Sequence, residues 1–153
     1  MTRVVALLRA VNVGGTGKVV MSELCAGLEA KLEAAVASAL GVKTEFFVRS
    51  AREWDAIVAG NPYARAAQDD PSRLVVLTFK SVPAAKAVAA LQAAIVGRET
   101  VSVAGKHAYA VYPDGQGTSK LTNAIFERKL GTSCTARNWN TVLKLAAAAA
   151  APS

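Results

Sequence analysis

The hydrophobic residues of this chain change their spacing along the sequence, and each change predicts a new element. An apolar, β-rich run over residues 4–13 ends in the glycine-rich stretch 14–18, which predicts a strand followed by a loop. Leucine or valine then recurs every four residues from Leu24 to Leu40. At about 100° per residue, such a stripe drifts around a helix by about 160° over the run. We therefore expect either one helix that wraps around a core or two helices joined in this stretch.

A second strand and helix follow. Residues 42–48 are typical of a strand, and Ser50 is suited to cap a helix over residues 52–59. Asn61-Pro62 ends that helix, because the residue before a proline disfavours helical backbone. These elements and the first strand make up a first α+β unit.

The next part of the chain predicts another α/β unit. The apolar run 74–79 indicates a strand, and residues 81–95 a helix with Pro83 near its first turn. Residues 99–103 and 108–112 predict the two arms of a hairpin. The order β-α-β-β-α is that of a ferredoxin-like half.

The fold class predicted from this order is α+β, with two ferredoxin-like units and antiparallel sheets. We place the first unit at residues 1–60, and the second, with the C-terminal helices, at residues 61–153. A chain of 153 residues is also of the usual size for one compact domain. Residues 146–151, all alanine, favour the end of a last helix.

Polar residues gather near the end of the chain. In the segment from Ser119, the residues Lys120, Asn123 and Glu127 stand at i, i+3 and i+7, which places them on one stripe if the segment is helical. Lys120 could hold an anion that Asn123 orients, with Glu127 as a weak candidate for an acid or base. The three side chains could equally form a structural network with each other and with the backbone.

The last segment repeats this pattern. Arg137, Asn140, Thr141 and Lys144 follow the spacing of one helical face. Thr135 or Asn138 could cap the helix, which explains one or two of these residues but not the whole set. The fork of Arg137 suits a carboxylate or phosphate, which makes it the first candidate for binding.

The net charge of +7 is concentrated at the two ends of the chain. Residues 1–23 carry three cations and one acid, and residues 116–153 carry five cations and one acid. If the two ends meet, they form a positive surface that attracts phosphates or carboxylates; otherwise they form a solvated basic surface. The candidate ligand-binding residues are Arg9, Asn12, Lys18, Lys120, Asn123, Arg137, Asn138, Asn140 and Thr141.

Several function classes find no support in the residues. The stretch 14–18 resembles a phosphate-binding loop, but Asn12 and Val19 stand where a Walker motif has glycine and serine or threonine. Phe79, Tyr109 and Tyr112 do not form the aromatic motif of a ferredoxin-like RNA reader, which favours phosphate contact without base reading. His107 has no evident catalytic partner.

The two cysteines, Cys25 and Cys134, lack metal-ligand or redox spacing, so we expect reduced thiols and a cytoplasmic protein. The apolar opening is too short to span a membrane. We expect no metal and no cofactor.

Six segments together carry a family resemblance: residues 5–15, 48–50, 61–62, 119–123, 127–131 and 135–141. With them the chain resembles an uncharacterised bacterial family called domain of unknown function 1697. The resemblance implies two ferredoxin-like units in one compact protein and no established reaction, substrate or cofactor.

One departure from the family concerns the first unit. Family members usually have a strand pair after the first helix, whereas here Ala30 runs directly into Lys31. The first unit therefore lacks its central strand pair, which leaves the first strand with an exposed edge. Either a stretch of chain is missing at this point, or another chain covers the edge, for example in a homodimer.

Three functional hypotheses stay open from the sequence. The leading one is a protein that binds an anionic small molecule or a nucleic-acid backbone at a basic polar site. The second is an enzyme that acts on a phosphorylated or carboxylated metabolite, with Glu127 as acid or base. The third is that the polar motifs are purely structural.

Overall fold

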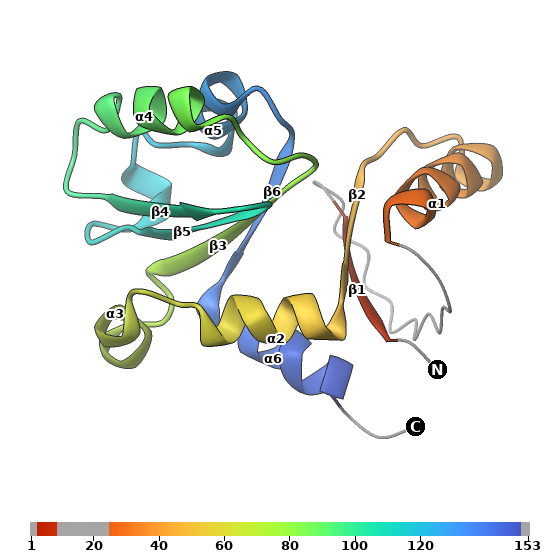
Figure 1. Cartoon of the computed structure of the whole chain (residues 1–153), viewed down its shortest axis with the longest axis horizontal. Helices are drawn as coiled ribbons and strands as arrows, with labels where there is room; N and C mark the ends of the chain where they lie inside the picture. The colour runs from red at the N-terminus through yellow and green to blue at the C-terminus, as the bar shows by residue number, and fades with distance from the viewer. Residues whose placement is uncertain (1–2, 9–24, 151–153) are drawn as a thin grey trace. The chain divides into compact units, whose positions relative to one another are not determined.

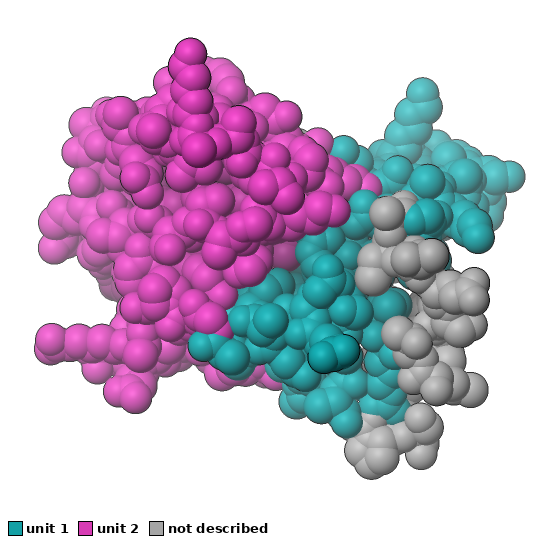
Figure 2. Space-filling model, viewed as in Figure 1, with its two compact units in different colours: residues 1–59, 145–153 teal, residues 60–144 magenta. Residues whose placement is uncertain are grey.

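In the computed structural model of the chain, the described residues are 3–8 and 25–150. The chain divides into two compact units, coloured separately in Figure 2. Unit 1 comprises residues 1–59 and 145–153, and unit 2 comprises residues 60–144. Residues 145–153 thus belong with unit 1, although the sequence pattern had assigned them to the second unit. Two antiparallel sheets and the helices around them confirm the α+β class.

Unit 1 contains two strands and two helices in its described residues before residue 60. Its elements are β1 (Val4–Leu8), α1 (Cys25–Leu40), β2 (Phe46–Ser50) and α2 (Ala51–Ala59). β1 and β2 pair antiparallel, with Ala6 opposite Val48, and they form a two-stranded sheet (Figure 1). α2 begins directly after β2.

The stripe of leucines in α1 is part of one continuous helix. Leu28 packs against Phe46 and Val48 of β2, and Leu32 and Val36 lie at the border of this cluster. The helix ends at Leu40, because Gly41 adopts the left-handed conformation (φ 65°) that terminates many helices. Beyond Val36, the helix extends past the small sheet, and the side chain of Leu40 is exposed.

Ser50 caps α2, as the sequence predicts. The backbone N–H of Glu53 donates to the Ser50 hydroxyl (3.2 Å), and the Ser50 backbone N–H donates to the Glu53 carboxylate (2.7 Å). This reciprocal pair is a capping box. It fixes the point at which β2 turns into α2.

Unit 2 is a complete βαββαβ arrangement. Its elements are α3 (Ala64–Asp69), β3 (Leu74–Phe79), α4 (Ala85–Ala93), β4 (Thr100–Ala104), β5 (His107–Val111), the 3-10 turn η1 (Gln116–Thr118), α5 (Asn123–Leu130) and β6 (Cys134–Asn138). The strand order β4-β5-β3-β6, with antiparallel neighbours throughout, is that of a ferredoxin-like sheet. The last helix, α6 (Trp139–Ala150), begins in unit 2 and ends in unit 1.

The core of unit 2 lies between the sheet and the two helices α4 and α5, which cover one face of it (Figure 1). Leu77, Phe79 and Phe126 are fully buried there. Tyr112 belongs to the same core, and its hydroxyl donates to the Leu121 carbonyl (3.0 Å), which satisfies its only polar group. Burial raises the pKa of Tyr112 above its ordinary value.

The opposite face of the same sheet is buried as well. Leu74, Val76, Thr78 and Tyr109 alternate with the core residues along β3 and β5, and each is at most 2% exposed. The sheet of unit 2 therefore offers no open apolar face around these residues.

Two helix boundaries predicted from the polar segments are wrong. Arg137 lies in β6, and α6 begins at Trp139, so Arg137 does not share a helical face with Asn140 and Thr141. Lys120 precedes α5, which begins at Asn123. In the first case, residues 134–138 are extended because they pair with β3, and such pairing overrides weak local propensity.

Candidate functional site

The first predicted polar group surrounds the start of α5. Lys120 is exposed and lies in the bend before the helix, and Asn123 is its first residue. The side-chain oxygen of Asn123 is buried and accepts no hydrogen bond from a described residue. Lys120 is therefore accessible to a ligand, whereas the oxygen of Asn123 is enclosed by the protein.

Glu127, the candidate acid or base, has a structural contact. Its carboxylate accepts a hydrogen bond from the backbone N–H of Cys134 (3.0 Å), where β6 begins. The thiol of Cys134 is buried and lies 3.8 Å from the backbone oxygen of Asn123. Glu127 thus links α5 to β6, and this contact gives a reason for its presence other than catalysis.

The second polar group is largely satisfied within itself. The side-chain oxygen of Asn138 accepts hydrogen bonds from the backbone N–H and from the hydroxyl of Thr141, both at 3.0 Å. Asn138 is therefore the N-cap of α6, in agreement with the capping interpretation. Asn140 is exposed, and its side chain forms no hydrogen bond with a described residue.

Arg137, the first candidate from sequence, also bonds to its own strand. Its guanidinium donates to the carbonyl of Ala136 (2.7 Å) and to the hydroxyl of Thr135 (3.0 Å). Burial of the side chain lowers the pKa of Arg137 below its ordinary value. The guanidinium of Arg137 therefore already donates hydrogen bonds to β6 and is not fully exposed to a ligand.

The two polar groups lie at opposite ends of β6. Glu127 contacts Cys134, the first residue of the strand, and the α6 cap is at Asn138, the last. Four residue steps along a strand span about 13 Å. In the structure, Asn138 contacts Thr141. These two residues lie apart from Glu127 and Asn123 of α5. The remaining candidates, Arg9, Asn12 and Lys18, lie outside the described residues, as does the glycine-rich stretch 14–18.

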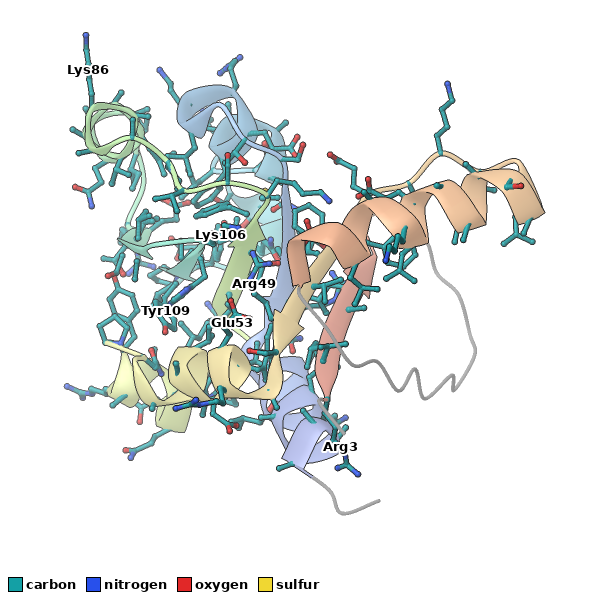
Figure 3. All side chains as sticks on the ribbon, turned by 45° about the vertical axis from the view of Figure 1, so that its right-hand side comes forward. Arg3, Arg49, Glu53, Lys86, Lys106 and Tyr109 are labelled. Atoms are coloured by element: carbon teal, nitrogen blue, oxygen red, sulfur yellow. The ribbon has the colours of Figure 1, made fainter. Side chains whose placement is uncertain are left out.

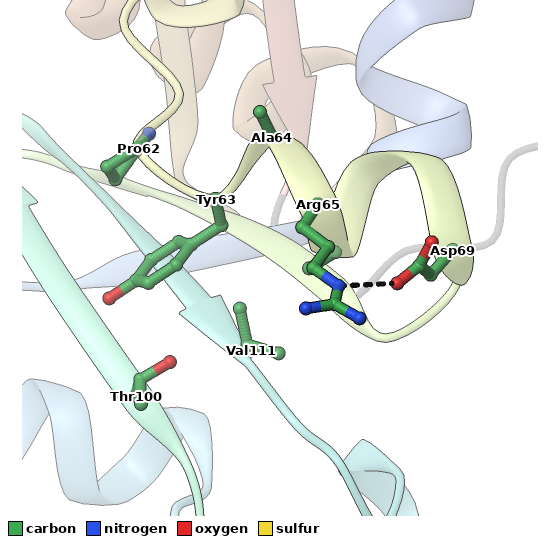
Figure 4. Close-up of a pocket in the computed structure, with 8 residues that line it drawn as sticks. Pro62, Tyr63, Ala64, Arg65, Asp69, Thr100 and Val111 are labelled. Carbon is green, nitrogen blue, oxygen red and sulfur yellow. Dashed lines mark hydrogen bonds and ion pairs between the residues drawn. The ribbon is translucent and has the colours of Figure 1, made fainter.

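An open cavity of about 520 Å³ lies elsewhere in unit 2, between α3 and strands β4 and β5 (Figure 4). Its lining includes Tyr63, Thr100 and Val111, and an ion pair between Arg65 and Asp69 (3.3 Å). None of the sequence-predicted site residues lines this cavity.

Cations without carboxylate partners among the described residues gather in and beside the helix layer of unit 2. Lys86 of α4, Lys120, and Arg128 and Lys129 of α5 form no hydrogen bond or ion pair through their side chains with a described residue. The side chain of Lys86 extends away from α4 (Figure 3). By contrast, the arginines Arg65, Arg73 and Arg98 of the same unit are paired with aspartates. Four cations of the helix layer and the segment before α5 are therefore uncompensated by described residues, and the exposed Lys144 of α6 is a fifth such cation in unit 2.

The topology places three of these cations at one end of the layer. Lys86 is in the first turn of α4, and Arg128 and Lys129 are in the last turn of α5. The segment before α4 contacts the segment after α5, since the Ser81 backbone N–H donates to the Thr132 hydroxyl (3.1 Å). Lys120 lies beyond the opposite end of α5, which is eight residues or about 12 Å long.

Sequence reasoning overlooked Lys86 and treated Arg128 and Lys129 only as charge. The signal was present in the order β-α-β-β-α-β, because both helices of that motif cover the same face of the sheet. α4 contains no acidic residue, and α5 contains one, Glu127. The sequences of these two helices therefore also indicated an excess of positive charge.

One sequence family matches the chain, under the description "Protein of unknown function (DUF1697)". The match covers two segments, residues 1–30 and 25–109, and so most of the chain. The chain belongs to this family. This confirms the resemblance seen in the sequence, and it does so without the polar C-terminal motifs, which lie beyond residue 109. No curated protein and no solved structure matches the chain.

The two matched segments of the DUF1697 family overlap at residues 25–30. The join lies where the sequence comparison placed the missing strand pair, between Ala30 and Lys31. In the structure, residues 25–40 are one helix, and unit 1 has two strands among its described residues. The family description assigns no activity. No helix in the described part of the chain is long and apolar enough to cross a membrane.

Proposed function

We propose that this DUF1697 protein binds an extended polyanion, such as a nucleic-acid backbone, along the helix layer of unit 2. The observation that carries the proposal is a set of cations without carboxylate partners among the described residues, the exposed Lys86, Lys120 and Arg128 and the half-buried Lys129. They contrast with the arginines elsewhere in the unit that are paired with aspartates. Lys120 is the residue retained from the sequence-predicted site.

An extended ligand fits this arrangement better than a small one. The cations lie at both ends of α5, about 12 Å apart along the helix axis. One nucleic-acid strand carries about one charge per 3.4 Å of axis, so this length corresponds to three or four phosphates.

Binding would be independent of base sequence. The aromatic residues of the sheet strands, Phe79 and Tyr109, are at most 1% exposed, so neither can stack on a base. Contacts between cations and phosphates alone give affinity that falls steeply with salt.

The test is to titrate a labelled single-stranded RNA of mixed sequence and to measure its dissociation constant over a range of salt concentrations. Four phosphate contacts give a slope of about −2.8 in a plot of log affinity against log salt, or about 50-fold weaker binding between about 50 and 200 mM. The double variant Lys86→Gln with Arg128→Gln should halve this slope.

The matched control is Arg65→Gln with Arg98→Gln, which removes the same charge from cations that already have aspartate partners. The control should retain most of the slope of the parent protein. Equal losses in both double variants would mean that net charge alone attracts the RNA, and the proposed surface would be wrong. Absence of any salt-sensitive binding to RNA or DNA would refute polyanion binding, and competition by millimolar inorganic phosphate would indicate a small-anion site.

A further inference from the structure

The hydrogen bonds of the small sheet in unit 1 define which backbone groups point outwards. The N–H of Ala51 donates to the carbonyl of Arg3 (3.0 Å), so these two residues form a hydrogen-bonded pair. Such pairs alternate with non-hydrogen-bonded ones in an antiparallel ladder. The odd-numbered residues of both strands therefore point their N–H and C=O groups at each other. The even-numbered residues point theirs away: Val4, Ala6 and Leu8 on β1, and Phe46, Val48 and Ser50 on β2.

Carboxylates occupy the outer edge of β2. The N–H of Phe46 donates to Glu33 (2.9 Å), that of Val48 to Glu29 (2.7 Å), and that of Ser50 to Glu53 (2.7 Å). Each outward N–H of this strand thus has an acidic partner. An incoming strand would have to displace three charged side chains, so this edge is protected against strand addition.

The outer edge of β1 has no comparable protection. Within the part of the chain that the structure describes, β1 pairs with β2 alone. The strand Val-Val-Ala-Leu-Leu contains no charge and no proline, the two devices by which edge strands usually resist pairing. The side chain of Ala6, at its centre, is exposed. A two-stranded sheet of this kind is marginal by itself.

We propose that the outer edge of β1 pairs antiparallel with β1 of a second copy of this chain, and that the two sheets join into one of four strands. Pairing about Ala6 sets Ala6 opposite Ala6 and Val4 opposite Leu8, so that all outward-pointing groups of both strands face each other. Each of these facing pairs exchanges two hydrogen bonds. The two-fold axis makes the interface self-complementary, as in most homodimers.

The side chains are compatible with this arrangement. α1 packs on β2, and among the described residues its cluster reaches β1 at Val4. The side chain of Ala6, at the centre of β1, is exposed, whereas its neighbours Val5 and Leu7 are buried. Alanine at the symmetry axis lets the two strands approach without a clash. This inference is independent of the proposed function, because it concerns unit 1 and involves none of the cations of unit 2.

The first test is the mass of the full-length protein in solution, measured by light scattering during gel filtration at about 100 μM. We expect about twice the 15.8 kDa of one chain. Ala6→Pro removes an N–H that points away from β2. The substitution therefore spares the hydrogen bonds between β1 and β2 and disrupts those between the two copies of β1. This variant should be monomeric with an unchanged circular dichroism spectrum. Ala6→Lys, which sets two like charges opposite each other, should also be monomeric.

The second test is cross-linking in a Cys25→Ser background. Hydrogen-bonded partners in an antiparallel pair have Cα atoms about 5.5 Å apart, which is suitable for a disulfide. Ala6→Cys should therefore cross-link under mild oxidation, whereas Ala34→Cys, an exposed position on α1, should not. A monomeric parent protein, a dimer that persists in both Ala6→Pro and Ala6→Lys, or equal cross-linking at both positions would overturn the proposal.

Discussion

Three asparagines in the C-terminal third of the chain occupy three different environments. Asn138 caps α6 through its side-chain oxygen, and Asn140 is exposed, with no side-chain hydrogen bond to a described residue. The side-chain oxygen of Asn123 is buried and accepts no hydrogen bond from a described residue. The sequence grouped them as one kind of candidate, because residue type indicates hydrogen-bonding capacity but not the partner. The partner depends on where the backbone turns, and at Asn138 it turns from strand to helix.

The cap supplies a matched pair of substitutions. Asn138→Ala should lower the free energy of unfolding by about 1 kcal/mol, because the N–H of Thr141 loses its acceptor. Asn140→Ala, two residues away, should change it by less than about 0.5 kcal/mol, as is usual at exposed positions. Urea unfolding followed by circular dichroism measures both. Equal losses would show that Asn140 has a structural partner and that the cap is not the main role of Asn138.

At the scale of elements, the sequence predicted best where local pattern and tertiary structure agree. β3 has the predicted bounds, residues 74–79, because an apolar run between polar connectors suits a strand buried on both faces. The hairpin of β4 and β5 turns at Gly105, whose φ of 57° favours glycine. The Ser50 cap likewise depends on neighbours in sequence alone.

The elements that sequence missed depend on distant partners. β6, with the sequence Cys-Thr-Ala-Arg-Asn, has a weak strand pattern and is extended because β3 supplies its hydrogen bonds. α3 was not predicted, since its residues 64–69 form no buried face that an apolar pattern could indicate. The stripe of α1 left two readings open, and the single helix became evident only with the small sheet that it covers.

The carboxylates of α1 fit the edge of β2 through matched spacing. Glu29 and Glu33 are one helical turn apart, about 6 Å along the axis. The N–H groups that donate to them, those of Val48 and Phe46, are two strand residues apart, about 6.6 Å. Glu29 also lies 3.5 Å from the guanidinium of Arg49, which is 6% exposed (Figure 3 labels Arg49). The carboxylate of Glu29 thus accepts a hydrogen bond from the edge of β2 and also lies beside a buried cation.

Glu29→Ala should therefore be costly. We expect the free energy of unfolding to fall by about 2 kcal/mol, because the substitution removes one partner of the buried Arg49 cation and leaves the N–H of Val48 without the acceptor that it has in Glu29. Lys31→Ala, an exposed change on the same helix, is the control and should have little effect. A loss below about 1 kcal/mol for Glu29→Ala would show that solvent or other groups replace this carboxylate, and that the edge of β2 is not protected as described.

At the scale of the whole molecule, the two units differ in how much structure supports them. Unit 2 has a four-stranded sheet with a core on its helix-covered face and buried residues on the other. The sheet of unit 1 has two strands in the described residues, and the α1 cluster contains three buried side chains, of which Val48 alone is fully buried. The order of elements in the sequence did not predict these unequal cores, because burial depends on which strands lie side by side.

The difference between the two cores predicts which unit opens first to hydrogen exchange. Native-state hydrogen exchange should give a lower opening free energy for the N–H groups of Phe47 and Arg49 in β2 than for that of Leu77 in β3, since small sheets with few buried contacts open before the global transition. The measurement is made on the full chain at two protein concentrations. If unit 1 is stabilised by a second copy through β1, the protection of β2 should rise with concentration, while that of β3 stays constant. Equal opening free energies for β2 and β3 at both concentrations would mean that the two units unfold as one cooperative structure.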